Sequence, residues 1–195
     1  MRRVAVFDFD GTLTTKDSLL QFILFAKGKK ATVMGFLLFI PLFVLMFLRL
    51  LDHSRCKELL LSYFFKGMPK SELLRLGEAF APRYKEIMRR ETTDLLQKHM
   101  QDGDTLYIIS AGLVEWVRPI ALSVGVKNVL GTEMAVDNQG ILTGRFATPN
   151  CFGQEKVNRL LEVEPQRDSY ILYAYGDSGG DKEMLAFADY SKKFS

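Results

Sequence analysis

Three mainly apolar runs in the chain each end on a small polar or acidic residue. They cover residues 4–8, 104–110 and 170–177, and they end on Asp8, Ser110 and Asp177. Short apolar runs of this kind are typical of strands that are buried on both faces, as in a parallel sheet. Because the carboxyl ends of parallel strands meet at one edge of a sheet, the pattern predicts that these three polar side chains lie close together.

Between these runs, the apolar residues recur at helical spacing. The predicted helices cover residues 113–124, 154–162 and 181–188, with turns at 11–12 and 111–112. Alternation on both sides of residues 137–140 predicts a hairpin over 129–146. Strand, turn and helix repeat in this order, so the expected fold is α/β with a doubly wound, mainly parallel, Rossmann-like sheet and an added β-hairpin. Since the sequence ends soon after the last helix, we expect a closing strand and helix to be short or absent.

A large helical insertion interrupts this pattern after the first strand. A helix is expected to begin near Leu19, with Asp17 or Ser18 at its N-terminus. Residues 54–65 and 69–100 are also helical in pattern, and Pro82 is expected to bend or break the second of these stretches. We therefore predict an α/β catalytic core at residues 1–17 and 101–195, and a helical cap at residues 18–100.

Residues 31–48 of the cap form an uncharged segment, ATVMGFLLFIPLFVLMFL. As a helix, it would be roughly 27 Å long, close to the thickness of a bilayer core. A single membrane span conflicts with the rest of the pattern, because Asp8 precedes the segment while Ser110 and Asp177 follow it. One crossing would place these residues on opposite sides of the membrane.

Two interpretations of residues 31–48 remain open. In the first, Pro41 divides the segment into two helical halves that form a re-entrant hairpin or dip into one leaflet. Basic residues on both flanks fit this peripheral membrane contact; they are Lys27, Lys29 and Lys30 before the segment, and Arg49, Arg55 and Lys57 after it. In the second, the segment is the buried core of the cap, where a helix that is apolar all round is also expected.

Composition and charge narrow the class of protein. The 195 residues carry a net charge of +3, with basic and acidic residues intermixed, so no nucleic-acid partner is expected. The two cysteines, Cys56 and Cys151, are too few for a disulfide framework and fit a reducing compartment. No cleavable signal sequence is recognised before the first strand. The expected localisation is cytoplasmic, at the inner face of the membrane if the apolar segment contacts lipid.

The chemistry predicted at the strand ends is that of a metal and a phosphate. Asp8, Asp10 and Asp177 supply carboxylates, with Asp181 nearby. Oxygen ligands without His or Cys indicate a hard divalent cation, in particular Mg²⁺, which commonly shares its coordination sphere with a phosphate. A phosphate site is further indicated by the charge of Lys156 near a helix N-terminus, the hydroxyl of Ser110 and the backbone N–H groups of Ala111 and Gly112.

The same residues resemble the four motifs of the haloacid dehalogenase-like hydrolases, in the order of that family. The motifs are Asp8-Phe9-Asp10-Gly11-Thr12, Ser110, Lys156 and Gly176-Asp177-Ser178-Gly179-Gly180-Asp181. The helical insertion is similar to the cap of the subgroup that includes phosphoserine phosphatase, and Asn150-Cys-Phe-Gly-Gln-Glu-Lys156 resembles that subgroup's approach to its lysine. A looser similarity links the apolar insertion to the phosphatidylglycerophosphate phosphatase of the subgroup.

The resemblance implies a Mg²⁺-dependent phosphatase that hydrolyses a phosphate monoester through an aspartyl phosphate. Asp8 would be the nucleophile, and Asp10 would protonate the leaving oxygen and then deprotonate water. Asp8, the Asp10 carbonyl and Asp177 would hold Mg²⁺. Ser110, Ala111, Gly112 and Lys156 would bind the phosphoryl group. Thr12 and Asp181 would support the site, with Asp181 orienting Lys156 or a metal-bound water.

The substrate is left open by the sequence. An apolar cap favours a lipid-linked phosphate, and the alternative is a soluble small molecule such as phosphoserine. Asp17 stands where phosphoserine phosphatases carry an acid that holds the substrate amine, although a helix N-cap explains it as well. Gly180 departs from the subgroup, which usually has Asn there. Alternatives of another class are a receiver-like signalling domain and a non-catalytic membrane-associated scaffold.

Overall fold

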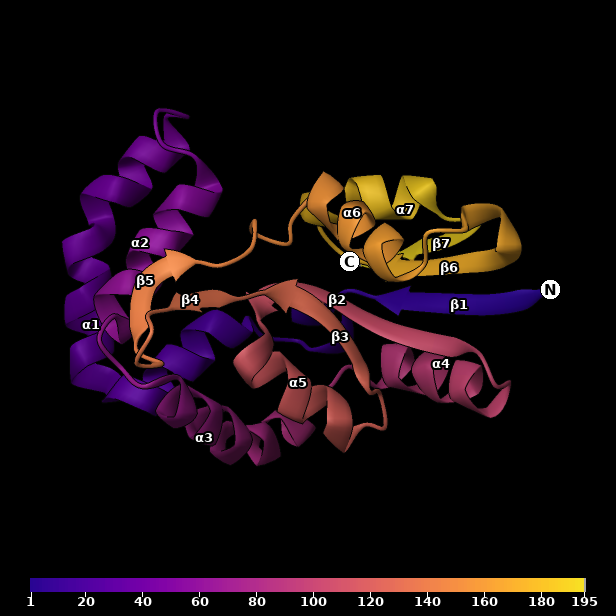
Figure 1. Ribbon diagram of the computed structural model, residues 1–195, viewed down its shortest axis with the longest axis horizontal. Coiled ribbons are helices and arrows are strands. Elements are labelled where there is room, and N and C mark those ends of the chain that lie inside the picture. The colour runs from indigo at the N-terminus through magenta and orange to yellow at the C-terminus, as the bar shows by residue number, and fades with distance from the viewer. Residues whose placement is uncertain (195) are drawn as a thin grey trace.

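A five-stranded parallel sheet forms the centre of the fold (Figure 1). The computed structural model describes residues 1–194, apart from the side chains of residues 85 and 86. The strand order is β3-β2-β1-β6-β7. The strands are β1 (Arg2–Phe7), β2 (Thr105–Leu113), β3 (Asn128–Thr132), β6 (Tyr170–Gly176) and β7 (Tyr190–Lys193). The predicted Rossmann-like fold class is confirmed.

Helices cover both faces of the sheet. Helices α4 (Arg90–Gln101) and α5 (Val114–Ser123) lie on one face, and α6 (Gln154–Val163) and α7 (Lys182–Phe187) lie on the other (Figure 1). Along β1, Ala5 and Phe7 join the core under α5, whereas Val4 and Val6 join the core under α6. Because successive side chains of a strand point to opposite faces, a strand covered on both sides is apolar at every position.

Three details of the core differ from the prediction. β2 continues through Ala111 and Gly112 with a register shift between Ser110 and Leu113, so no turn occurs there. Of residues 129–146, the first part is β3 of the central sheet, and only β4 (Met134–Val136) and β5 (Leu142–Phe146) form the hairpin. The last helix is preceded by a 3₁₀ turn, η4 (Gly179–Asp181). The closing strand, expected to be short or absent, is indeed short: β7 has four residues and pairs with β6.

The cap consists of α1 (Ser18–Phe47), α2 (His53–Phe65) and α3 (Lys70–Phe80), followed by the 3₁₀ segment η2 (Ala81–Ile87). As predicted, Asp17 is the N-cap of α1, and its carboxylate accepts the Leu20 N–H at 2.9 Å. Helix α4 contacts β2 and the turn η1 (Phe9–Leu13), so it lies with the central sheet. The proposed division into residues 18–100 and the remainder stays a prediction.

The prediction that Pro41 divides the apolar segment is wrong. Helix α1 runs on through Pro41, and its kink lies at Gly28, where φ is +78°. Glycine adopts a positive φ at no steric cost, so the chain bends there in preference to a position with a side chain. The apolar segment is therefore a continuous helix, and no re-entrant hairpin forms at Pro41.

The interpretation of residues 31–48 as a buried cap core is also wrong. Phe36 and Phe39 pack toward Phe64 and Tyr63 of α2, but the other side of α1 has no covering element among the described residues. Large apolar side chains on that side are exposed, with Phe47 at 86%. Within the described residues, α1 is the one helix long and apolar enough to cross a membrane, judged by length and composition.

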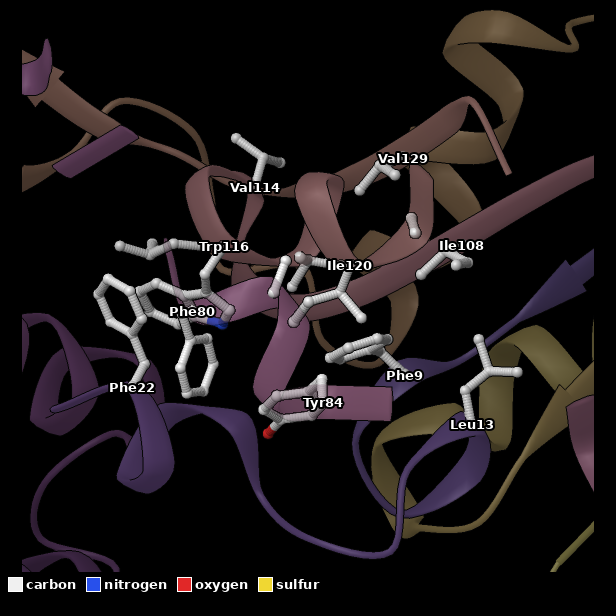
Figure 2. Packing of buried hydrophobic residues seen from close by; sticks show 14 of the residues in the cluster. Phe9, Leu13, Phe22, Phe80, Tyr84, Ile108, Val114, Trp116, Ile120 and Val129 are labelled. Carbon is white, nitrogen blue, oxygen red and sulfur yellow. The ribbon is translucent and has the colours of Figure 1, made fainter. Parts of the chain in front are cut away.

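Aromatic packing joins the first turns of α1 to the catalytic core. Figure 2 shows Phe22 of α1 beside Trp116 of α5 and Phe80 of α3. The rings of Phe22 and Trp116 stack with centroids 4.5 Å apart, and the Trp116 Nε1–H donates to Ser18 Oγ at 3.1 Å. The start of α1 is thereby fixed against α5, whereas the apolar half beyond Gly28 projects away from this contact.

Glu115 in the first turn of α5 yields a stability prediction. Its carboxylate is buried, and neither oxygen has a hydrogen-bond partner among the described residues. Burial raises the pKa of Glu115, and the nearby backbone N–H of the same residue and Lys70 Nζ, at 3.8 Å, offset this only in part; Glu133 repels the charge and Arg118 attracts it. The protonated form therefore favours folding, and this contribution is lost as the pH rises above the usual carboxyl range.

We expect Glu115→Gln to remove this pH dependence. At pH 8, the variant unfolds roughly 2–4 °C above the parent, equivalent to about 1 kcal/mol for a chain of this size. Near pH 4, the two proteins unfold at similar temperatures. Thermal denaturation followed by circular dichroism across this range measures the difference. A constant gap at all pH values would show that packing, not the charge, is responsible.

Candidate active site

A buried lysine links two of the predicted acids at the carboxyl edge of the sheet. Lys156 on α6 donates from Nζ to Asp8 Oδ1 and to Asp181 Oδ1, at 2.5 Å each. Burial raises the pKa of Asp8 to about 6, even though Lys156 acts in the opposite direction. For Lys156, the two carboxylates outweigh burial and raise the pKa. The lysine therefore stays charged and holds Asp8 in one orientation.

Asp181 positions the lysine rather than facing the cavity. Its Oδ2 accepts the N–H groups of Asp177 and Ser178 at 3.1 and 3.0 Å, and the Ser178 hydroxyl at 3.1 Å. Burial alone would raise the pKa of Asp181, but Lys156 and these hydrogen bonds lower it. With Oδ1 on Lys156 and Oδ2 on the η4 turn, Asp181 is fully engaged in fixing the lysine, one of the two roles implied by the resemblance.

The carboxylates of Asp8 and Asp177 lie on either side of the Thr12 hydroxyl. The Thr12 hydroxyl lies 3.0 Å from Asp8 Oδ2 and 3.2 Å from Asp177 Oδ1, so it can donate to one of them at a time. Carboxylate oxygens of Asp8, Asp177 and Asp181 lie within 4.8 Å of one another. Since Asp181 is held by Lys156, the pair Asp8 and Asp177 remains as an oxygen-only donor set of the kind that suits a hard cation.

Asp10 lies on the side of the cavity that faces the cap. Its Oδ1 accepts the Ser18 N–H at 2.7 Å, and its Oδ2 accepts the Ser18 hydroxyl at 2.8 Å. Burial, with repulsion from Asp17 and Asp8, raises the pKa of Asp10 to about 7. The sequence identified Ser18 only as a capping candidate, yet this residue and Trp116 behind it fix the Asp10 carboxylate.

The register shift in β2 shapes the wall of the cavity opposite Asp10. Ser110, Ala111 and Gly112 all line the cavity, as predicted from the strand end. The Gly112 N–H donates to Ser110 Oγ at 2.9 Å, so in this state it is occupied rather than free for a ligand. This bond leaves the Ser110 hydroxyl proton available to donate into the cavity, because the oxygen already accepts from Gly112.

The cavity has a volume of about 270 Å³ and lies between the cap and the strand ends. The sequence did not identify four of its lining residues as part of a site: Leu19, His53, Asn150 and Phe152. Lys57 was expected only as one of the basic residues flanking the apolar segment. Lys57 Nζ donates to the Ala111 carbonyl and, at 3.0 Å, to Asn150 Oδ1. Burial lowers the pKa of Lys57 to about 8. In the sequence, the stretch of residues 150–156 that leads to Lys156 was a signal for Asn150. No sequence pattern indicates that α2 packs against this wall of the cavity.

Gly180 and Phe152 account for one departure from the phosphoserine phosphatase pattern. A Cβ at Gly180 would lie 2.3 Å from Phe152 Cε2, so any side chain there requires the ring to move. Phe152 also stacks on His53 of the cap, with ring centroids 5.8 Å apart. An aromatic contact between core and cap thus occupies the space that an Asn at position 180 would need.

The fold and the acid–lysine site together define a capped, Rossmann-like hydrolase. The chain belongs to the haloacid dehalogenase-like hydrolase family, whose model matches residues 5–186. This confirms the resemblance inferred from the four motifs and argues against a receiver domain. Protein CicA of Caulobacter vibrioides is 32% identical over 191 residues, which cover 95% of this chain and 83% of that protein. A probable phosphatase of Mycobacterium tuberculosis is 29% identical over 94% of this chain and 66% of its own length.

Solved structures agree on the fold. A Bordetella pertussis protein of unknown function has a TM-score of 0.82 at 22% identity, covering 98% of this chain and 89% of its own. A phosphoserine phosphatase with bound substrate has a TM-score of 0.65 at 17% identity, covering 100% of this chain and 86% of its own. At these identities, the likeness concerns the fold, and the chemistry must be argued from the site.

Proposed function

We propose that the protein is a Mg²⁺-dependent phosphatase that hydrolyses a phosphate monoester through an aspartyl phosphate on Asp8. The observation that carries this proposal is the Asp8 carboxylate, held by Lys156 at the cavity with Asp177 within 4.8 Å. A carboxylate serves as a nucleophile when it is fixed in place and the charge of its anionic target is offset.

The donor set fits magnesium. Asp8 and Asp177 would hold the ion with their carboxylates, and Asp10 would contribute its carbonyl, since its carboxylate is bound to Ser18. When bound, Mg²⁺ supplies positive charge that offsets the phosphoryl oxygens. Thr12 would then donate to only one of the two acids, consistent with its position between them. The family assignment supports the same cofactor.

In the proposed reaction, Asp8 attacks phosphorus and the bond to the leaving oxygen breaks as Asp10 donates its proton. Asp10 then takes a proton from water, which attacks the phosphoryl group and releases phosphate and free Asp8. The raised pKa of Asp10, about 7, supports a proton that can move both ways near neutral pH. Ser110, the backbone at Ala111, and Lys156 would bind the phosphoryl oxygens, and the Gly112 N–H would join them once it releases Ser110 Oγ.

The leading substrate class is a lipid-linked phosphate monoester, met at the cytoplasmic face of a membrane. The exposed side of α1 supports this choice, because a soluble monomer rarely leaves so many large apolar side chains in water. Basic residues lie at both ends of that segment, including Lys29, Lys30 and Arg49, and they suit an anionic bilayer surface. Residues 31–48 would lie along the membrane without crossing it, so that the whole active site stays on one side.

A second candidate is a soluble phosphatase acting on a small amine-bearing ester such as phosphoserine. Asp17 favours it, because this residue lines the cavity while only its Oδ1 caps α1. The other carboxylate oxygen would accept from a substrate ammonium group. The likeness in fold to phosphoserine phosphatases is compatible with either substrate.

A substrate panel with and without Mg²⁺ tests the proposal. We expect the protein to hydrolyse a phosphatidyl-type or other long-chain phosphate in mixed micelles at least tenfold better than phosphoserine or a sugar phosphate, and chelation to abolish every activity. Preference for phosphoserine would replace the lipid with the second candidate. Failure to hydrolyse any ester in the panel would favour a catalytically silent scaffold and end the proposal.

A further inference from the structure

A second, apolar cavity adjoins the catalytic cavity on the side of the cap. This second cavity lies between α1 and α2 and has a volume of about 240 Å³. Four residues line both cavities: Asp17, Leu19, His53 and Lys57. They form a neck through which a molecule bound at Asp8 can extend into the cap.

Beyond the neck, the walls are almost entirely carbon. They are formed by the side chains of Leu20, Phe36, Phe43, Met46, Cys56 and Leu60. No charged side chain lines this part of the cavity among the described residues, since Asp17, His53 and Lys57 all belong to the neck. An apolar lining of this kind favours an apolar occupant over a polar metabolite.

Contacts between residues of the neck and the core hold the second cavity in place relative to the catalytic one. Lys57 on α2 bonds to the Ala111 carbonyl and to Asn150, and both partners belong to the core. His53, at the start of the same helix, stacks on Phe152 of the core. A group leaving from phosphorus therefore meets polar side chains first and apolar ones a few atoms further on.

We propose that the cavity between α1 and α2 binds a hydrocarbon chain carried by the leaving group of the substrate. This inference rests on the proposed function and adds to it a specific site and a measurable selectivity. The polar part of the leaving group lies at the neck, beside Lys57 and His53. The chain then runs along the wall formed by Phe36, Phe43 and Met46, and these side chains set the preferred length.

A series of n-alkyl phosphates tests the inference without a membrane. Methyl, butyl and octyl phosphate are compared below their aggregation concentrations with Mg²⁺ present. We expect kcat/KM to rise about fourfold for each methylene that enters the cavity, the fold-change that corresponds to removing one methylene from water. Turnover of methyl phosphate with no increase along the series would overturn the inference and leave the proposed function intact. Failure to hydrolyse any member would count against the proposed function itself.

A matched pair of substitutions on α1 locates the effect. Met46 lines the cavity, whereas its neighbour Leu45 points to solvent and is 41% exposed. Met46→Gln should reduce the ratio of kcat/KM for octyl over methyl phosphate at least tenfold, and Leu45→Gln should leave that ratio unchanged. Equal losses in both variants would assign the selectivity to the outer surface of α1 and overturn the inference. Thermal unfolding of each variant checks that the cap is folded. If Met46→Gln does not fold, the alkyl phosphate series measured on the parent protein still decides the question.

Discussion

Replacement of Asp8 by Asn is expected to lower kcat/KM for every hydrolysed phosphate ester by on the order of 10⁴-fold or more, the range seen when a nucleophile is removed. The amide has nearly the shape of the carboxylate, but it neither attacks phosphorus nor carries the charge that pairs with Lys156. Steady-state kinetics with saturating Mg²⁺ measure the loss. A substrate labelled at phosphorus should also leave a covalent phosphoryl group on the parent protein and none on the variant.

The folded state of the Asp8→Asn variant is expected to survive, which makes the result interpretable. Lys156 keeps its second partner, Asp181, so the buried ammonium is not left without a counter-charge. Circular dichroism and the unfolding temperature serve as the control. A folded variant with activity within tenfold of the parent would rule out Asp8 as the nucleophile and with it the proposed mechanism.

The strand-end residues were predictable from the sequence because their position depends on local pattern alone. An apolar run that ends on Asp8 or Asp177 defines a buried strand and its carboxyl end, and parallel packing brings those ends together. Ser110 lies instead at the register shift of β2, three residues before that strand ends. The order of the motifs then identified Lys156, although a lone lysine on a helix carries no signal. Its contact with Asp8 depends on α6 covering the sheet, which the repeated strand and helix pattern had predicted.

The cap was less predictable because its geometry depends on tertiary contacts. Proline is the stronger helix breaker in isolation, yet α1 passes through Pro41 and bends at Gly28, where the change of direction brings Phe36 against Phe64 of α2. Lys57 appears in the sequence as one more basic residue beside an apolar segment. Its burial at the neck follows from the docking of α2 on the core, and no spacing along the chain encodes it.

The second substitution with a large expected effect is at Gly11, which lies directly against the Asp177 carboxylate. Its φ is +82°, and a Cβ there would lie 2.2 Å from Asp177 Oδ2 and 2.7 Å from Asp177 Cγ. An alanine must therefore displace the Asp177 carboxylate from its place beside Asp8. Because a misplacement of about 1 Å in such a site can cost 10²-fold, we expect Gly11→Ala to lower kcat by about 10²-fold or more and to raise the Mg²⁺ concentration needed for half-maximal activity at least tenfold.

Gly67 provides the matched control for backbone strain. Its φ is +83°, nearly the same as that of Gly11, but a Cβ there meets no atom within 4 Å. Gly67→Ala should thus lose stability by about 1 kcal/mol and keep its kinetics and its Mg²⁺ dependence. A Mg²⁺ titration of activity, run on the parent and both variants, separates the two effects. If both variants behave alike, backbone strain alone explains the loss in Gly11→Ala. Only a shift in Mg²⁺ dependence confined to Gly11→Ala ties Asp177 to the metal.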